Sequence, residues 1–179
     1  MVRTRAEDGG ADLATVELFG LDFVSEATID DVVAVLLAGD GETEGWRCLV
    51  TPNVDHVVRY RRVPEDRAVA EAASLVLPDG MPIVWASRLL RRPIRSRLAG
   101  SDLFNALWPR LAADDVPTVL IASRPEVAEQ LRREHPNAAI LEPPMFSLDD
   151  EAAVNRLLDE VLAACEATGA RFLLSGIST

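Results

Sequence analysis

The sequence contains no lysine and few aromatic residues. All 18 of its basic residues are arginine, and Phe, Trp and Tyr make up 5% of the 179 residues. Acidic residues number 29, so the formal net charge is −11 at pH 7. Because a general nucleic-acid binder needs an excess of cations to neutralise phosphates, this charge excludes nucleic acid as an expected partner. With so few aromatics, the core must be built from Val, Leu, Ile and Ala.

Cysteine and long hydrophobic runs are also scarce. Cys48 and Cys165 lie far apart in apolar runs, so we expect two small buried residues rather than a disulfide framework or a zinc site. His56 and His135 have no Cys or second His nearby, so no metal site is expected. No run approaches the ~20 apolar residues that span a bilayer, and residues 1–11 lack the apolar segment of a signal peptide. The expected location is cytoplasmic, with a peripheral contact to the inner face of the cell membrane left open.

Short apolar runs alternate with longer helical patterns along the whole chain. This alternation predicts an α/β fold with a Rossmann-like, mostly parallel sheet, helices on both faces and a short N-terminal β-hairpin around Gly20. We expect residues 1–12 to form a flexible tail and residues 13–179 a single domain. Strands are expected at 15–19, 21–24, 46–50, 74–77, 118–122, 138–141 and 171–175, and helices at 28–37, 53–62, 65–73, 81–90, 101–113, 125–134 and 149–168.

Polar residues follow two of these strands, where ligands bind in open α/β sheets. In Thr51-Pro52-Asn53, Asn53 is predicted either to cap the next helix or, with Thr51, to direct polar groups into the crevice. Pro78-Asp79-Gly80 is a common turn sequence, and it would also hold a carboxylate at the mouth of the crevice, where a general base could act. Spacing alone does not decide between these alternatives.

Two further segments carry charge or polar groups. Arg88–Arg97 holds five arginines in ten residues, which indicates either a solvated helix end or a cationic patch for pyrophosphate or anionic lipid headgroups. Gly100-Ser101-Asp102 is typical of a helix start, with Ser101 or Asp102 as the cap and an acid in the first turn. The chain lacks a phosphate-binding P-loop, a nucleophile elbow and a dinucleotide fingerprint, which excludes several common enzyme classes.

Taken in order, three motifs resemble the WecG/TagA/CpsF family of bacterial glycosyltransferases (glycosyltransferase family 26). They are TPNVDH from Thr51, LVLPDGM from Leu75 with a following VWA, and RLAGSDLF from Arg97. The likeness covers about residues 16–179. It implies transfer of N-acetylmannosamine, its uronic acid or a related sugar from UDP to a polyprenyl-diphosphate-linked acceptor. In this family that reaction serves teichoic acid, enterobacterial antigen or capsule assembly at the cytoplasmic membrane face.

The same resemblance implies roles for individual residues. Asp79 would be the base that removes the acceptor hydroxyl proton during inverting attack on the anomeric carbon, and Arg97 would face the donor diphosphate or the acceptor. No metal and no cofactor are implied, in agreement with the absence of an Asp-x-Asp triplet. The residues expected to bind substrate are Thr51, Asn53, Gly80, Arg97, Gly100, Ser101 and Asp102.

The sequence departs from the family pattern in three places. The family's Gly-x-Gly-x-Pro-Lys-Gln-Glu segment and its arginine-rich C-terminal appendage have no counterpart after Thr179, and Ser123-Arg124 replaces a glycine-rich turn. These departures leave open the alternative of a truncated, non-catalytic homologue that binds a UDP-sugar or acts as a scaffold. Apolar strand ends left exposed by a missing segment would promote a homo-oligomer.

Overall fold

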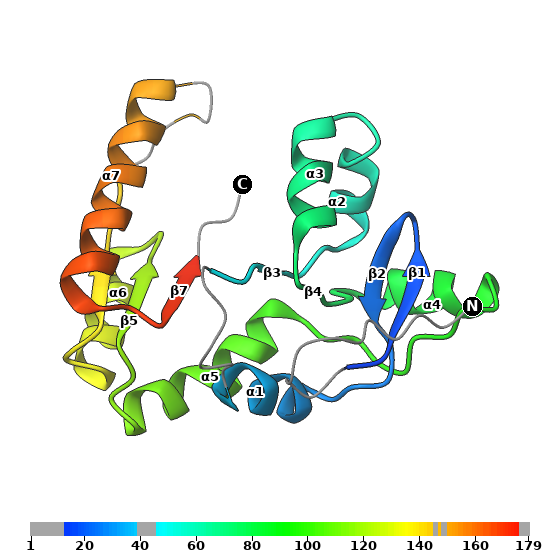
Figure 1. The fold of residues 1–179 in the computed structure, drawn as a ribbon, viewed down its shortest axis with the longest axis horizontal. Coiled ribbons are helices and arrows are strands. Elements are labelled where there is room, and N and C mark those ends of the chain that lie inside the picture. The colour runs from blue at the N-terminus through cyan, green and yellow to red at the C-terminus, as the bar shows by residue number, and fades with distance from the viewer. Residues whose placement is uncertain (1–12, 39–45, 145–146, 148–149, 176–179) are drawn as a thin grey trace. The chain divides into compact units, whose positions relative to one another are not determined.

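The computed structural model describes residues 13–38, 46–144, 147 and 150–175 (Figure 1). The expected tail at residues 1–12, residues 39–45 and the last four residues lie outside this range. Contacts between residues divide the chain into two compact units, Met1–Ala106 and Leu107–Thr179. Each unit is described by itself.

The first unit begins with the predicted β-hairpin. Strands β1 (Thr15–Leu18) and β2 (Leu21–Val24) pair antiparallel, with Leu18 opposite Leu21. The two residues between them, Phe19 and Gly20, have φ values of 58° and 82°. Positive φ at both central residues is the conformation that lets a two-residue turn follow the twist of a hairpin.

Parallel strands extend this hairpin into a four-stranded sheet of order β1-β2-β4-β3. Strands β3 (Leu49–Val50) and β4 (Leu75–Val76) are short and parallel, with Leu49 opposite Leu75 and Val50 opposite Val76. Phe23 of β2 lies opposite Val76 of β4, also in parallel. The carboxyl ends of β2, β4 and β3 therefore share one edge of the sheet.

Helices connect these strands. Pro64 and Pro82 lie in the first turns of α3 and α4, where a missing N–H costs no hydrogen bond. At the start of α1, Thr28 and Asp31 bond each other's backbone N–H groups reciprocally, as in a capping box. The helices of this unit are α1 (Ile29–Ala38), α2 (Val54–Arg59), α3 (Pro64–Ala72), α4 (Met81–Leu89) and the start of α5 (Gly100–Ala113).

The core of the first unit is aliphatic except for one aromatic ring. Phe23 is fully buried at its centre, together with Ile83 and Val84 from α4 and Ala70 from α3. The remaining buried members come mainly from the sheet: Val16, Leu18, Leu21, Val57, Val76 and Ile94. A core of Val, Leu, Ile and Ala is what the low aromatic content predicted.

The second unit holds a three-stranded parallel sheet of order β6-β5-β7. Its central strand, β5 (Thr118–Ile121), is buried at every residue, as a parallel strand covered on both faces should be. The flanking strands are β6 (Ala139–Leu141) and β7 (Phe172–Ser175), and the helices are α6 (Pro125–Glu134) and α7 (Glu151–Thr168), which ends at Gly169 in the left-handed conformation. Glycine is favoured at this position because it has no Cβ.

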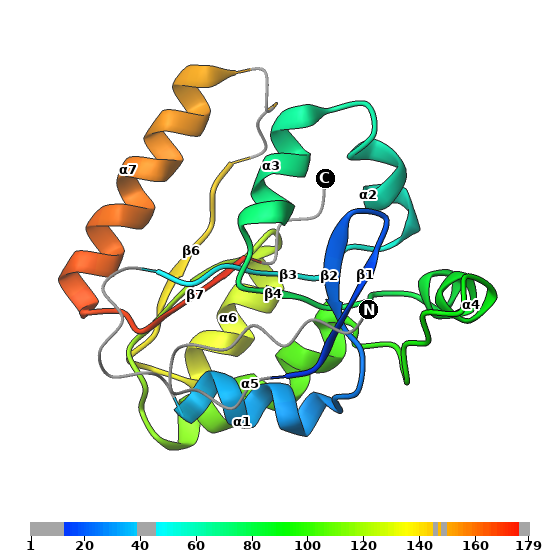
Figure 2. The ribbon, with the colours of Figure 1, turned by 45° about the vertical axis from the view of Figure 1, so that its right-hand side comes forward.

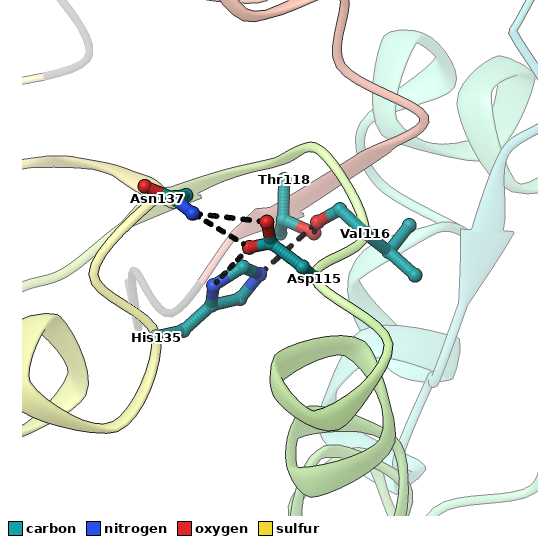
Figure 3. Close-up of polar contacts among 5 residues, drawn as sticks. All are labelled: Asp115, Val116, Thr118, His135 and Asn137. Atoms are coloured by element: carbon teal, nitrogen blue, oxygen red, sulfur yellow. Dashed lines mark hydrogen bonds and ion pairs between the residues drawn. The ribbon is translucent and has the colours of Figure 1, made fainter.

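A buried histidine joins the segments that precede and follow α6 in this second unit (Figure 3). His135 is 1% exposed, its Nε2 lies 3.0 Å from the carbonyl oxygen of Val116, and its ring packs on Trp108 with centroids 5.6 Å apart. Its Nδ1 lies 3.7 Å from a carboxylate oxygen of Asp115, which Asn137 holds through two hydrogen bonds of 2.9 Å. His135 therefore acts in the packing of this unit, just beyond the end of α6 rather than within it.

These observations confirm the predicted α/β class, with parallel strands flanked by seven helices in the described residues and a short N-terminal strand pair (Figure 2). Two local predictions were wrong. The strand expected at 46–50 is limited to Leu49–Val50, and Cys48 is exposed and Cys165 only half-buried. Cys48 precedes the part of the run that pairs with β4, so it is not covered by the sheet.

Candidate active site

The loop after β3 places Thr51 and Asn53 at the carboxyl edge of the first sheet. The side-chain oxygen of Asn53 accepts hydrogen bonds from the backbone N–H groups of Asp55 (3.0 Å) and His56 (3.1 Å). In return, Nδ1 of His56 accepts from the N–H of Asn53 at 3.2 Å. Asn53 is therefore the N-cap of α2, as one of the two alternatives predicted. Its amide NH2 group has donors to spare for a ligand.

The loop after β4 runs beside the first one. Leu77 donates its backbone N–H to the carbonyl of Val50 (2.9 Å), and Asp79 donates its N–H to the carbonyl of Pro52 (3.1 Å). These two bonds continue the parallel pairing of β3 and β4 beyond the strands. Asp79 is half-buried, and its carboxylate has no hydrogen-bond or ion-pair partner among the residues that the structure describes.

Gly80 follows Asp79 with φ of 113° and is the N-cap of α4. This conformation is strained for any residue with a Cβ. The glycine thus allows the chain to pass directly from the Asp79 loop into the helix. The position of the carboxylate relative to α4 depends on this one backbone conformation.

A third segment, Arg97–Asp102, reaches the same two loops. Leu98 donates its backbone N–H to the carbonyl of Pro78 at 2.9 Å. Gly100 lies so close to Thr51 that a Cβ at position 100 would be 2.8 Å from Oγ1 of Thr51. Only glycine fits without a shift of one partner. All three motifs that were separate in the sequence are therefore adjacent in the first unit.

Arg97 and Asp102 form an ion pair across the start of α5. The distance from a guanidinium nitrogen of Arg97 to Oδ2 of Asp102 is 2.6 Å, and the two side chains are 42% and 46% exposed. Helix α5 begins at Gly100, so the expectation that Ser101 or Asp102 would be its cap was wrong. The helix begins earlier because Gly100 fits against Thr51. Ser101 is exposed in the first turn, and Asp102 follows it there, as predicted.

The arrangement combines a carboxylate and a guanidinium group, which suit the transfer of a group from an anionic leaving group to a hydroxyl. A half-buried carboxylate without partners can accept a proton from a hydroxyl group within hydrogen-bond reach. The guanidinium group of Arg97, from the third segment, can stabilise negative charge on a leaving group. Its exposed ion pair with Asp102 contributes only about 0–1 kcal/mol, so an anionic ligand can replace it. The described residues contain no group of three or more His, Cys, Asp or Glu side chains able to hold a metal ion.

Comparison with known proteins agrees with this order of motifs. Residues 16–179 match the sequence profile of the glycosyl transferase WecG/TagA/CpsF family. The chain belongs to this family. The match covers most of the chain and includes both units.

A curated protein is similar to the chain over a shorter stretch. The N-acetylglucosaminyldiphosphoundecaprenol N-acetyl-beta-D-mannosaminyltransferase of Bacillus spizizenii is 39% identical over 59 residues. This stretch is 33% of the present chain and 23% of the length of that relative. The name of the relative describes transfer of an N-acetylmannosaminyl group to a lipid-diphosphate-linked N-acetylglucosamine.

Within this WecG/TagA/CpsF chain, the structure places the sequence-predicted site residues in one neighbourhood of the first unit. Sequence reasoning missed the role of His56. From the third helical position, its side chain accepts a hydrogen bond from the backbone N–H of Asn53 and completes a capping box. The signal for it was the spacing of a capping box, in which His56 takes the place of the usual Glu or Gln. Sequence reasoning also missed that Gly100 packs on Thr51, because a contact between positions so far apart leaves no local pattern.

Proposed function

We propose that this chain is a hexosyltransferase that uses a UDP-sugar and a lipid-linked acceptor. The sugar is of the N-acetylhexosamine type, N-acetylmannosamine or its uronic acid, and the acceptor is a saccharide linked to polyprenyl diphosphate. The reaction serves the synthesis of cell-surface polysaccharide or teichoic acid at the cytoplasmic face of the membrane. Family membership and the name of the Bacillus spizizenii relative support this choice of substrates.

One observation carries the assignment of the site. The three loops that hold the family-like motifs meet through the backbone hydrogen bonds from Asp79 to Pro52 and from Leu98 to Pro78 and through one close glycine contact. Among the described residues, the Asp79 carboxylate in this neighbourhood has no partner. A carboxylate that serves only a turn would bond its own backbone. Asp79 instead remains available to accept a proton.

The proposed step is a direct displacement with inversion. The acceptor hydroxyl oxygen forms a bond to the anomeric carbon, while the bond from that carbon to the UDP oxygen breaks and its electron pair leaves with UDP. The hydroxyl proton passes to the carboxylate of Asp79, which later releases it to water. Base catalysis of this kind contributes about 10²- to 10⁴-fold to the rate.

The remaining site residues would bind the donor and hold the geometry. Arg97 would exchange its ion pair with Asp102 for the donor diphosphate, whose charge increases as the bond breaks. Asn53 would offer its amide NH2 group, and Thr51 and Ser101 their hydroxyl groups, to the sugar or the acceptor. Gly80 and Gly100 would keep the loops close enough for these groups to reach one ligand.

The test compares Asp79→Asn with Asp22→Asn, which removes a charge from an exposed carboxylate of β2. We expect Asp79→Asn to lower the rate of sugar transfer by about 10²- to 10⁴-fold, with UDP binding by calorimetry retained. Asp22→Asn should transfer sugar at the rate of the original chain. Equal rates for all three proteins would contradict the role of Asp79.

The same experiment separates the enzyme from a non-catalytic homologue. If the unchanged chain binds UDP but forms no product with any lipid-linked acceptor, it is a UDP-sugar-binding or scaffolding protein. Failure to bind UDP at all would contradict both functions.

A further inference from the structure

Helix α4 exposes apolar side chains on the side that faces away from the core. Ile83 and Val84 are buried in the core of the first unit, whereas Trp85 is 60% and Leu89 83% exposed. Met81, Trp85 and Leu89 follow one another at intervals of four residues and therefore line one stripe of the helix. Leu90, directly after the helix, is exposed as well. We call Met81, Trp85, Leu89 and Leu90 the apolar stripe.

Helices α2 and α7 also expose apolar residues four positions apart, Val54 and Val58 and then Leu158 and Leu162, but α4 carries the two largest exposed groups, and α6, of similar length, has no such pair. Helix α6 buries Ala128 and Leu131 and presents Glu, Gln and Arg side chains to solvent. A surface helix ordinarily has this arrangement, with one apolar and one polar face. Helix α4 is apolar on two opposite faces, and only one of them is covered by the first unit.

Arginines lie at the end of the apolar stripe and in the segment that follows it. Residues 81–97 contain five arginines and no Asp or Glu, in a chain whose net charge is −11. Arg92 donates to the carbonyl oxygen of Glu17 (2.6 Å), and Arg97 pairs with Asp102. Arg88 and Arg91, next to Leu89 and Leu90, are exposed and have no side-chain partner among the described residues. The acids that face this cluster are Asp102, paired with Arg97, Glu17, paired with Arg92, and Asp31, which interacts with Arg95.

We propose that the apolar stripe and the arginines at its end bind the surface of an anionic lipid bilayer. A tryptophan and leucines beside arginines are the composition of helices that lie in the membrane interface, with the apolar face among the acyl chains and the cations at the phosphates. A local positive charge in an otherwise acidic chain selects an anionic partner. Among the described helices none is long and apolar enough to cross a bilayer, so this contact lies along the surface. In Figure 2 the helix is seen nearly end-on, beside β1 and β2.

The first measurement is sedimentation of the full chain with lipid vesicles. We expect binding to vesicles of equal parts phosphatidylglycerol and phosphatidylcholine, and little binding to phosphatidylcholine alone, since each arginine near an anionic surface strengthens binding about fivefold. Equal binding to both kinds of vesicle, or to neither, would overturn the proposal.

Two variants and two matched controls locate the contact. Trp85→Ser with Leu89→Ser should weaken binding more than about tenfold, because it removes the largest exposed apolar groups of the stripe. Its control, Val58→Ser with Val69→Ser, changes exposed apolar residues on α2 and α3 and should bind as the original chain does. If these controls lose binding to the same degree, the contact is not at α4.

The second variant pair tests the charges. Arg88→Gln with Arg91→Gln should weaken binding to anionic vesicles about 30-fold. Arg61→Gln with Arg62→Gln removes two exposed arginines elsewhere and should have a smaller effect. Both α4 variants should bind UDP like the original chain, so loss of vesicle binding is distinguishable from failure of the proposed active site.

A second copy of this chain is the competing occupant of the stripe. Light scattering distinguishes a membrane surface from a second copy. If the stripe binds a membrane, Trp85→Ser with Leu89→Ser leaves the molar mass unchanged. A dimeric chain that this double variant converts to a monomer would overturn the membrane proposal.

Discussion

The two units place their polar side chains in different ways. In the second unit, Thr118 and the buried His135 both bond the carbonyl oxygen of Val116, and Asn137 holds Asp115. Most of these polar groups have partners within the unit, although Nδ1 of His135 makes no hydrogen bond with the described residues and lies 3.7 Å from a carboxylate oxygen of Asp115. In the loops of the first unit, the backbone makes the connections, and the half-buried side chains of Thr51 and Asp79 have no hydrogen bond among the described residues.

The difference distinguishes polar groups that stabilise a fold from polar groups that await a ligand. A buried polar group is costly unless it is paired, so His135 is retained where its partner is. A half-buried group that faces water in the free protein can remain unpaired at little cost. On the function proposed above, a substrate supplies the partner that the described residues do not supply to Asp79.

The largest effect on stability is expected from His135→Ala. The substitution removes the ring that packs on Trp108 and the bond to the Val116 carbonyl, so the free energy of unfolding should fall by about 2–4 kcal/mol. Asn137→Ala, at an exposed position, should cost about 1 kcal/mol or less, and Asp79→Asn about 0.5 kcal/mol or less. Denaturant unfolding measures all three. If Asp79→Asn lowers the free energy of unfolding as much as His135→Ala does, the proposed difference between the polar groups of the two units is wrong.

A moderate effect is expected from Gly100→Ala. The new methyl group would meet Oγ1 of Thr51 at 2.8 Å, which should cost about 1–3 kcal/mol of stability and displace the loop. Thr51→Ala removes that oxygen and should restore part of the loss. A double-mutant cycle in denaturant would then give a coupling energy of at least about 0.5 kcal/mol. Additive effects would mean that the two residues do not pack as described.

The smallest effect on stability is expected at the start of α1, where the side chain of an acidic residue, Asp31, takes part in capping the helix. The backbone N–H and then the hydroxyl group of Thr28 donate to Asp31 and lower the pKa of its carboxyl group. Because the pKa is lower in the folded chain, the stability it contributes is present above the unfolded pKa, about 4, and is lost as the pH falls through the folded value. The stability difference between the original chain and Asp31→Asn should therefore shrink in acid.

Thermal unfolding at pH 7 and at successively lower pH measures this difference. Thr28→Ala removes the hydroxyl donor and is the control, since it should reduce the dependence on pH. A difference between the original chain and Asp31→Asn that is constant with pH would contradict the interpretation.

Much of the fold could be predicted because its elements are bounded by local signals. Helix α6 begins at Pro125 and ends at Glu134 as expected, since proline marks its first turn and Pro136 follows its end. The strand expected at 46–50 shows the limit of such reasoning. Trp46, Arg47 and Cys48 are exposed, and Leu49 and Val50 are the residues that lie opposite β4, although the carbonyl of Cys48 still accepts from the N–H of Leu75. An apolar run does not reveal where its partner strand stops.

The candidate site was predictable in its parts and not in its assembly. The rule that ligands bind beyond parallel strands selected Thr51, Asn53 and Asp79. The packing of Gly100 on Thr51 and the bond from Leu98 to Pro78 depend on how distant segments meet. Such contacts are set by the tertiary structure, and one sequence alone carries no pattern for them.

The direct passage from Asp79 through Gly80 into α4 has a geometric consequence. The helix is nine residues long, so its axis extends about 13 Å from the loop. If α4 rests on a bilayer as proposed, the carboxylate of Asp79 stays close to the lipid phosphates, because Gly80 alone separates Asp79 from the helix. A sugar on a polyprenyl diphosphate also projects a short, fixed distance from that surface. The protein would then find its acceptor by diffusing in two dimensions, at the one depth where that sugar occurs.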